Sequence, residues 1–259
     1  MAKKPTWVIE KERGRRAAAS ETLWLFGLHA VRDALSNPKR EVLRLVVSKN
    51  AGDKLADAIA ARGIAPEIAD PRKFPVPLDP GSVHQGAALE VKPLDWGDWR
   101  ALARGTGDRA VVVMLDRVSD PHNVGAILRS AEVFGATAVI APARHSAPES
   151  GALAKTASGA LERMPYARIG NLGDAMEALK TDGFWMIGLA EEGAQSIDEV
   201  AAIHREGNVA LVMGAEGPGL RERTRELCDV LAKIPFARDF GSLNVSNAAA
   251  VALYALTRG

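Results

Sequence analysis

Residues 110–135 read AVVVMLDRVSDPHNVGAILRSAEVFG, and this stretch decides the fold that the sequence predicts. Six apolar residues, 110–115, are followed by a polar loop and then by apolar positions at helical spacing from Val124 to Phe134. An unbroken apolar run is typical of a strand covered on both faces, and a strand followed by a helix is the repeating unit of a parallel sheet. We therefore expect an α/β domain built around such a sheet.

Further apolar runs follow, with helical stretches between them. They lie at 138–140, 167–169, 184–189, 209–213 and 230–234. This alternation predicts one parallel-sheet domain over residues 109–259. Ligands of such sheets bind beyond the carboxyl ends of the strands, so the loops after the runs are where a site is expected.

The first part of the chain predicts a smaller α/β unit over residues 21–95. Proline, glycine and aspartate concentrate over 92–99 and 103–108, and we interpret residues 96–108 as a linker. Residues 1–20 contain six lysines and arginines against two glutamates, which is either a solvated tail or a basic arm for a phosphate backbone. Helices and strands of the small unit are expected at 27–35, 42–47, 54–62 and 87–91.

Composition excludes several classes of protein. The chain has 259 residues, of which 47% are hydrophobic, and its 33 basic and 32 acidic side chains nearly balance, which argues against wholesale disorder. A single cysteine, Cys228, excludes a disulfide scaffold and a cysteine-rich zinc site. No apolar run approaches the ~20 residues of a membrane span, and no secretory signal begins the chain, so we expect a cytoplasmic protein.

The loop after residues 110–115 carries the first candidate side chains. Apolar positions from Val124 to Phe134 form one stripe, and Arg129 lies on another side of the predicted helix, from which it can reach a cleft. Asn123 stands where an N-cap belongs, so it is either a capping residue or a ligand-binding one. Taken alone, Arg129 also fits a solvated surface charge.

Two later loops are rich in residues that suit a binding site. In VMGAEGPGL, residues 212–220, Glu216 stands among glycines that let a backbone approach a ligand closely. In IPFARDFGSLNVSNAAAVALY, residues 234–254, serines and asparagines including Ser242 and Asn244 precede a nearly all-apolar helix. These polar residues could cap that helix, although they are more than capping needs. Such a helix must be buried all round, in a core or against another subunit.

Other well-known motifs are absent. The segment GAEGPG at 214–219 is not the dinucleotide-binding G-x-G-x-x-G, and the sequence has neither a P-loop nor a G-x-S-x-G turn. This argues against a nicotinamide oxidoreductase. The five histidines are too scattered for a sequence-local metal site, so no metal is expected.

Together, in this order, the three loops resemble the three motifs of the SpoU (TrmH) family of RNA ribose 2′-O-methyltransferases, in the SPOUT class. The matching segments are DPHNVGAILR at 120–129, MGAEGPGL at 213–220 and SLNVSNA at 242–248. The resemblance covers about residues 110–259. The front unit resembles the substrate-binding domain of many members, through FGLHAV at 26–31 and VHQG at 83–86.

The resemblance implies a parallel α/β domain with a deep carboxy-terminal trefoil knot, S-adenosylmethionine (SAM) bound in a bent form at the knot, and an obligate homodimer through this domain. By motif position, the cofactor-binding residues would be Leu189, Gly214, Ile234, Phe236 and Leu243. The catalytic residues would be Asn123, Arg129, Glu216, Ser242 and Asn244.

The implied reaction is attack of a ribose 2′-oxygen on the methyl group of SAM, with the protein left to position the reactants and manage one proton. The family's motif-one arginine, here Arg129, is proposed as the base. Because a guanidinium with a pKa above ~12 is a poor base, we expect Arg129 to bind the target phosphate and stabilise the developing oxyanion. Asn123 would hold the nucleotide or Arg129, and Glu216 would orient Arg129 and the substrate. Ser242 and Asn244 would fix the ribose and the loop.

With its front unit, the chain most resembles members that methylate a guanosine of 23S-type large-subunit ribosomal RNA. The alternatives are 2′-O-methylation of a transfer RNA guanosine, because the catalytic motifs do not encode the target, and a non-catalytic RNA-binding or ribosome-assembly protein. Near-neutral overall charge predicts RNA-binding patches that are local. Candidates for them are Lys39, Arg40, Arg44, Arg117, Arg129, Arg144 and Arg163.

Overall fold

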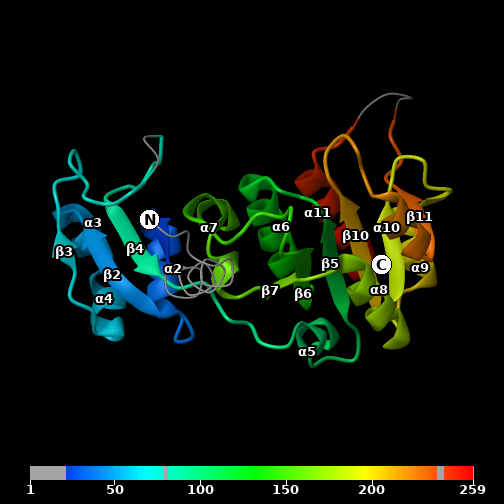
Figure 1. Ribbon diagram of the computed structural model, residues 1–259, viewed down its shortest axis with the longest axis horizontal. Coiled ribbons are helices and arrows are strands. Elements are labelled where there is room, and N and C mark those ends of the chain that lie inside the picture. Colours follow the sequence, from blue (N-terminus) through cyan, green and yellow to red (C-terminus); the bar gives the residue numbers. More distant parts are fainter. Residues whose placement is uncertain (1–21, 79–80, 238–241, 259) are drawn as a thin grey trace, which may run out of the picture. The chain divides into compact units, whose positions relative to one another are not determined.

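The chain forms two compact units, Met1–Leu94 and Asp95–Gly259, in a computed structural model that describes residues 22–78, 81–237 and 242–258 (Figure 1). The predicted basic tail over residues 1–20 lies outside the described residues. Each unit has its own sheet. The units are therefore described separately.

The first unit is built on a four-stranded sheet of order β1-β4-β2-β3. Its central strand β4 pairs antiparallel with β1 and β2, and β2 pairs parallel with β3. Two strands and two helices fall where the sequence predicts them, at β2, β4, α2 and α4, whereas β1, β3 and α3 were not predicted. The elements are β1 (Leu23–Phe26), α2 (Leu28–Ser36), β2 (Val42–Val47), α3 (Lys49–Lys54), α4 (Ala56–Arg62), β3 (Glu67–Ile68) and β4 (Ala87–Val91).

The two short motifs of the first unit meet in space. The side chain of Gln85 accepts a hydrogen bond from the backbone N–H of Leu28 at 3.0 Å, at the amino end of α2. Gly86 has a φ of +77°, and a Cβ atom there would lie 2.3 Å from the hydroxyl oxygen of Ser48. Only glycine fits so close an approach, so Gly86 is required for the turn that brings the motifs together.

The second unit contains a seven-stranded sheet of order β7-β6-β5-β10-β8-β11-β9, and all its paired strands are parallel. The six predicted apolar runs correspond to β5, β6, β7, β8, β10 and β11, which confirms the α/β fold class; the two-residue strand β9 was not predicted. The elements are α5 (Trp99–Arg104), β5 (Val111–Asp116), α6 (Pro121–Val133), β6 (Ala138–Pro142), α7 (Gly151–Ala157), the 3₁₀ turn η1 (Ala160–Glu162), β7 (Tyr166–Ile169), α8 (Leu172–Thr181), β8 (Trp185–Leu189), β9 (Gln195–Ser196), α9 (Ile197–Ile203), β10 (Val209–Gly214), α10 (Glu222–Leu227), β11 (Val230–Lys233) and α11 (Val245–Arg258).

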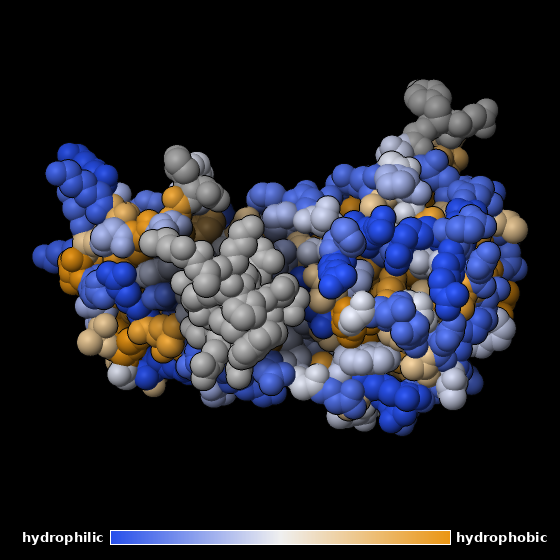
Figure 2. All heavy atoms as spheres, in the orientation of Figure 1, coloured by the Kyte–Doolittle hydropathy of each residue, from blue (hydrophilic) through white to orange (hydrophobic). Residues whose placement is uncertain are grey.

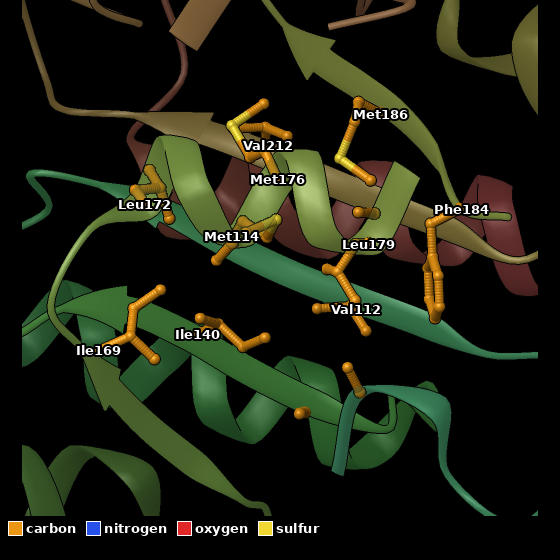
Figure 3. Close-up of a cluster of buried hydrophobic side chains, with 14 of the residues drawn as sticks. Val112, Met114, Ile140, Ile169, Leu172, Met176, Leu179, Phe184, Met186 and Val212 are labelled. Carbon is orange, nitrogen blue, oxygen red and sulfur yellow. The ribbon is translucent and has the colours of Figure 1, made fainter. Parts of the chain in front are cut away.

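Helices cover both faces of this sheet. On one face, Met176 and Leu179 of α8 pack against Val112 and Met114 of β5, and Figure 3 shows these side chains pointing toward one another between helix and strand. On the other face α11 packs against α6, α9 and β10. Full burial of each large apolar side chain contributes about 1.5–3 kcal/mol, so the sheet is held from both sides.

The segment predicted to be a linker, 96–108, requires correction. It contains α5, whose Ala103 is fully buried, and whose Trp99 and Leu102 pack against the same cluster of side chains as α8. The hydroxyl of Thr137 donates to the carbonyl of Ala103 at 2.8 Å. The proline and glycine around this short helix concealed its apolar side, and the helix belongs to the second unit.

Exposed hydrophobic side chains on the second unit include a group on α6 and α11. Val133 is 68% exposed, Val251 43% and Tyr254 58%. The predicted final helix α11 is therefore buried on one side only within a single chain. On the face drawn in Figure 2, hydrophilic side chains cover most of the second unit, with smaller hydrophobic areas between them. No helix among the described residues is long and apolar enough to cross a membrane.

Candidate active site

Loops of the second unit gather at the carboxyl ends of two central strands. β5 and β10 are neighbours, and Asp116 pairs with Gly214 at their ends. The loop after β5 leads into α6. The loop after β10 folds back on itself, because the backbone N–H of Gly219 donates to the carbonyl of Ala215 at 2.9 Å.

Three of the predicted catalytic residues form one hydrogen-bond network. The amide of Asn123 donates to Glu216 Oε1 at 3.2 Å. The amide of Asn244 donates to Asn123 Oδ1 at 2.9 Å and to Glu216 Oε1 at 2.5 Å. Asn123 is buried, whereas Glu216 is exposed, and the second carboxylate oxygen of Glu216 makes no hydrogen bond with the described residues. The network therefore fixes Glu216 and leaves an acceptor free for a ligand.

Asn123 is not the cap of its helix. The cap of α6 is Asp120, whose carboxylate accepts a hydrogen bond from the backbone N–H of His122 at 2.9 Å, and Pro121 is the first helical residue. The sequence-based interpretation of Asn123 as an N-cap is wrong, because Asp120 already satisfies that part of the helix end. The amide of Asn123 is thus available to the site.

Asn244 has both of the functions that the sequence left open. Its Oδ1 accepts hydrogen bonds from the backbone N–H and the hydroxyl of Ser246, at 2.9 and 2.6 Å, at the start of α11. Its amide group meanwhile belongs to the network. Ser242 is exposed and lines the cavity described next. Asn244 therefore couples the final helix to the site.

Arg129 lies apart from this network. It is exposed, and it makes no hydrogen bond or ion pair within the part of the chain that the structure describes. It lies six positions after Asn123, which places it about 9 Å farther along the helix and about a third of a turn around it. The predicted contact between Glu216 and Arg129 is therefore not present in a single chain.

A cavity of about 540 Å³ adjoins the network. Its walls come from the ends of β8 and β10, the loop after β10, and the segment before α11. Glu216, Ser242 and Asn244 line it, whereas Asn123 and Arg129 do not. The five residues predicted to bind a cofactor all line it: Leu189, Gly214, Ile234, Phe236 and Leu243.

The cavity combines apolar surface with charged groups. Phe236 is 41% exposed and Leu243 40%, so both offer apolar area that a flat ring can cover. Glu192 also lines the cavity and forms an ion pair with Arg225. Hydrogen bonds from its own backbone N–H and from Arg225 hold the pKa of the Glu192 carboxyl below its ordinary value. The cavity thus suits a ligand with an aromatic part and polar or cationic groups.

Asp116 and Arg221, which the sequence did not single out, hold the loop after β10 in place. The carboxylate of Asp116 is fully buried and accepts hydrogen bonds from the backbone N–H of Arg221 at 3.0 Å and from its Nε at 2.6 Å. These bonds clamp the end of the loop against β5. Where the loop begins, at the last residue of β10, a Cβ atom on Gly214 would lie 2.2 Å from the carbonyl carbon of Gly219, so residue 214 must be glycine. A carboxylate directly after an apolar strand was the available signal for Asp116.

The described part of the chain offers neither a cluster of metal-binding side chains nor a reactive thiol. No group of three or more histidine, cysteine, aspartate or glutamate side chains that could hold a metal ion occurs there. Burial, and next the neighbouring Asp229, raise the pKa of the Cys228 thiol to about 12. A thiolate nucleophile is therefore scarce near neutral pH.

The predicted RNA-binding cations differ in their surroundings. Arg40 is fully buried, so its assignment to a surface patch is wrong. Arg44 and Arg163 form ion pairs with glutamates. The exposed arginines of the set without a partner in the described residues are Arg117, Arg129 and Arg144.

Comparison with known proteins identifies the class to which this fold and site belong. Residues 110–254 match the model of the SpoU rRNA Methylase family. Residues 24–96 match the model described as RNA 2′-O ribose methyltransferase substrate binding. The chain therefore belongs to the SpoU rRNA methylase family.

Curated relatives within this class are similar along nearly their whole length. They are named 23S rRNA (guanosine-2′-O-)-methyltransferase RlmB. The protein from Salmonella typhimurium is 37% identical over 244 residues, which cover 90% of this chain and 97% of the relative. Those from Coxiella burnetii and Escherichia coli are 35% and 36% identical, again over 90% of this chain, and over 94% and 97% of their own lengths.

Solved structures share the fold. The SpoU methyltransferase AviRb from Streptomyces viridochromogenes, in complex with the cofactor AdoMet, superposes with a TM-score of 0.77 at 24% identity, covering 95% of this chain and 92% of that one. An AdoMet-bound rRNA methyltransferase from Sinorhizobium meliloti gives a TM-score of 0.74 at 22% identity, covering 100% and 97%.

Proposed function

We propose that this protein transfers a methyl group from SAM to the ribose 2′-oxygen of a guanosine in 23S-type ribosomal RNA. The observation that carries the proposal is the network of Asn123, Glu216 and Asn244, which joins three distant segments beside a cavity of about 540 Å³. Membership of the SpoU family supports the reaction. Relatives named 23S rRNA (guanosine-2′-O-)-methyltransferase support the substrate.

The residues of the cavity fit SAM. Cavities that hold small molecules have volumes of about 300–1,000 Å³, and this one lies within that range. The partly exposed side chains of Phe236 and Leu243 suit an adenine ring. Carboxylates from Glu191 and Glu192 suit a ribose hydroxyl or a cationic sulfonium and ammonium.

SAM, when bound, supplies an electrophilic methyl group. The chain's own residues position the ribose against it. We assign to Glu216, whose Oε1 is held by two amides, the orientation of the ribose 2′-hydroxyl through its free oxygen. Asn123 and Asn244 keep that carboxylate in place, and Ser242 lies where it can contact the ribose. Correct placement of reacting groups supplies much of the rate in such displacements.

Arg129 is assigned to the phosphate beside the target ribose. Its position outside the cavity wall suits contact with RNA rather than with the cofactor. A guanidinium at that point also stabilises negative charge that develops on the 2′-oxygen as the hydroxyl proton passes to the free carboxylate oxygen of Glu216. A guanidinium is a better electrostatic partner than a proton acceptor.

The first unit binds and selects the RNA in this proposal. Support comes from its match to the substrate-binding family model over residues 24–96. Proteins usually select RNA by shape and by unstacked bases in loops, which a separate small domain can contact while the catalytic domain acts on one ribose.

We infer further that the protein is a homodimer through the second unit. Val133, Val251 and Tyr254 are exposed on α6 and α11, two helices that pack together, and Tyr254 contacts the ring of Phe134 edge-on with centroids 5.9 Å apart. An apolar group of this kind favours burial against a second copy. The family resemblance supports the trefoil knot, and the bacterial rRNA relatives support a cytoplasmic location.

The proposal is tested with purified protein, radiolabelled SAM, and separate transcripts of 23S ribosomal RNA and transfer RNA. We expect label in 23S RNA, at a 2′-O-methylated guanosine mapped by resistance to alkaline cleavage. Label in transfer RNA alone would show that the substrate is transfer RNA and that the assignment to 23S ribosomal RNA is wrong. Tight RNA binding without label, in the presence of bound SAM, would show an RNA-binding protein without this activity.

A further inference from the structure

Two exposed arginines and an exposed histidine of the second unit lie on two loops next to the site. Arg117 follows β5, and Arg144 and His145 follow β6. β5 and β6 are parallel neighbours, so both loops leave the same edge of the sheet. The loops also touch, since the backbone N–H of Ala147 donates to the carbonyl of Val118 at 3.4 Å. The three side chains therefore form one surface, which we name the basic ledge.

The charge of the basic ledge is not neutralised nearby. Arg117, Arg144 and His145 are exposed, and none of them makes a hydrogen bond or ion pair with the described residues. Of the carboxylates on these loops, Asp116 is bonded to Arg221 and Asp120 caps α6.

A further cation and a further carboxylate lie at the same edge. Arg168, on the adjacent strand β7, donates to the carbonyl of Ala143 and keeps its charge. Glu149 is the remaining acid of the loop after β6. Three arginines therefore lie at this edge of the sheet: Arg117, Arg144 and Arg168. Besides Asp116 and Asp120, these loops carry one acid, Glu149.

The backbone of the basic ledge is strained at two of its three residues. Arg117 has a φ of +62° and His145 a φ of +66°, both in the left-handed region. Glycine adopts that region without strain, whereas residues with a Cβ atom do not. An arginine and a histidine at these two positions fit a binding surface, because strained backbone collects at functional sites.

We propose that the basic ledge binds the phosphate backbone of the RNA substrate. The proposal rests on the proposed function and adds a further contact with RNA on the methyltransferase unit, besides the one assigned to Arg129. Arg117 lies in the short loop between β5 and α6, and Asn123 lies in the first turn of α6, so RNA held by the ledge passes close to the site. Arginine fits phosphate oxygens with its planar donors, and such contacts position RNA without reading its sequence.

The test compares two double variants in salt-dependent RNA binding. Arg117→Gly with Arg144→Gln removes two ledge cations, and glycine suits the backbone at 117, so the variant should fold at least as well as the natural protein in urea unfolding. We expect the slope of log affinity against log salt to fall by roughly 0.7–0.9 for each phosphate that the variant no longer binds. Affinity for a 23S RNA transcript should fall roughly three- to tenfold near 150 mM salt. Affinity for SAM, measured by calorimetry, should not change.

The matched control is Arg205→Gln with Arg258→Gln. These arginines are exposed and have no partner in the described residues, and both lie away from the two loops. The control should keep the natural salt slope. An equal loss in both double variants, or a natural slope in the ledge variant, would overturn the proposal while the natural protein still methylates RNA. If the natural protein neither binds nor methylates RNA, the proposed function fails and the ledge proposal fails with it.

Discussion

Among the candidate catalytic side chains, Arg129 is the one whose function is explained least by its surroundings within a single chain. It is exposed and without a partner in the described residues, so the protein does not hold its guanidinium in one direction. Arg129→Lys keeps the positive charge and removes the planar fork. We expect methylation to fall at least tenfold, about 1.4 kcal/mol of transition-state stabilisation, with SAM affinity unchanged. Arg258→Lys is the control, and near-natural methylation by the Arg129→Lys variant would refute the assignment of Arg129.

Asp116 offers a prediction about positioning rather than contact. Asp116→Asn removes the charge that pairs with Arg221 and leaves one good acceptor where two are used. The loop after β10 should loosen, and we expect SAM affinity to fall about tenfold and stability by about 1–3 kcal/mol. Calorimetry and urea unfolding measure the two effects. Asp198→Asn, an exposed aspartate on α9, should change neither.

A purely structural function of Asp116 is distinguished by a second comparison. Arg221→Lys keeps the ion pair while losing the geometry of the Nε bond. If Asp116 positions the cavity, both variants should bind SAM more weakly than the natural protein. The loss of SAM affinity should be larger in whichever variant loses more of the Asp116–Arg221 hydrogen bonds, whether or not its stability changes in proportion. Equal stability loss with natural SAM affinity in both variants would contradict the positioning function.

At the residue level, the sequence could predict which side chains line the site but not how they bond. The lining residues follow strand ends, and strand ends are visible as the last residues of apolar runs. Whether Asn123 caps α6 or enters the site depends on which residue is the N-cap. The structure shows that Asp120 is the N-cap, and the sequence alone could not decide this. In the same way, no local pattern could show that Arg40 is buried.

The short helix α5 provides the prediction at the scale of elements. Arg100 donates to the two carboxylate oxygens of Asp182, at 2.6 and 2.7 Å, and Arg104 donates to Oδ1 at 3.0 Å. Hydrogen bonds from Arg100 first, and from Arg104 second, hold the pKa of Asp182 well below its ordinary value of 3.8. Because the folded form holds this proton more weakly than the unfolded form, the pair stabilises the fold above about pH 4. That contribution is lost as the pH falls toward the depressed pKa.

Asp182→Asn tests this linkage between stability and pH. We expect the variant to unfold at lower urea concentration than the natural protein from pH 8 down to about 5, by a constant difference. Below about pH 4 the two curves should converge. Asp174→Asn, on the solvent side of the same helix α8, is the control and should not produce the effect. A difference that stays constant to pH 2 would exclude the ion pair as its source.

Elements differ in how visible they are in the sequence. The buried strands of the parallel sheet are continuous apolar runs, so six of them were predicted correctly. The strands β3 and β9 have two residues each and carry no hydrophobic pattern. Helix α5 has six residues between glycines and buries only one side, which explains why composition suggested a linker there.

At the scale of the whole molecule, the proposed dimer gives a further prediction. Tyr254→Glu places a charge among exposed apolar side chains of α6 and α11. If two copies pair there, burial of that charge is costly and the dimer should dissociate. Sedimentation should show a dimer for the natural protein and a monomer for the variant. Ile203→Glu, an equally exposed apolar residue on α9, should leave the dimer intact. A natural protein that sediments as a monomer contradicts the inference.

The placement of the cavity wall has a consequence for synthesis of the protein. Ile234, Phe236, Leu243 and Asn244 all follow strand β11, and the cavity has no wall on that side without them. Chains fold from the amino end as they emerge from the ribosome. A nascent or prematurely terminated polypeptide can therefore form much of the sheet and still lack a place for the methyl donor. Competence to bind the methyl donor therefore requires that the segment after β11 has been made and has packed beside the loop after β10.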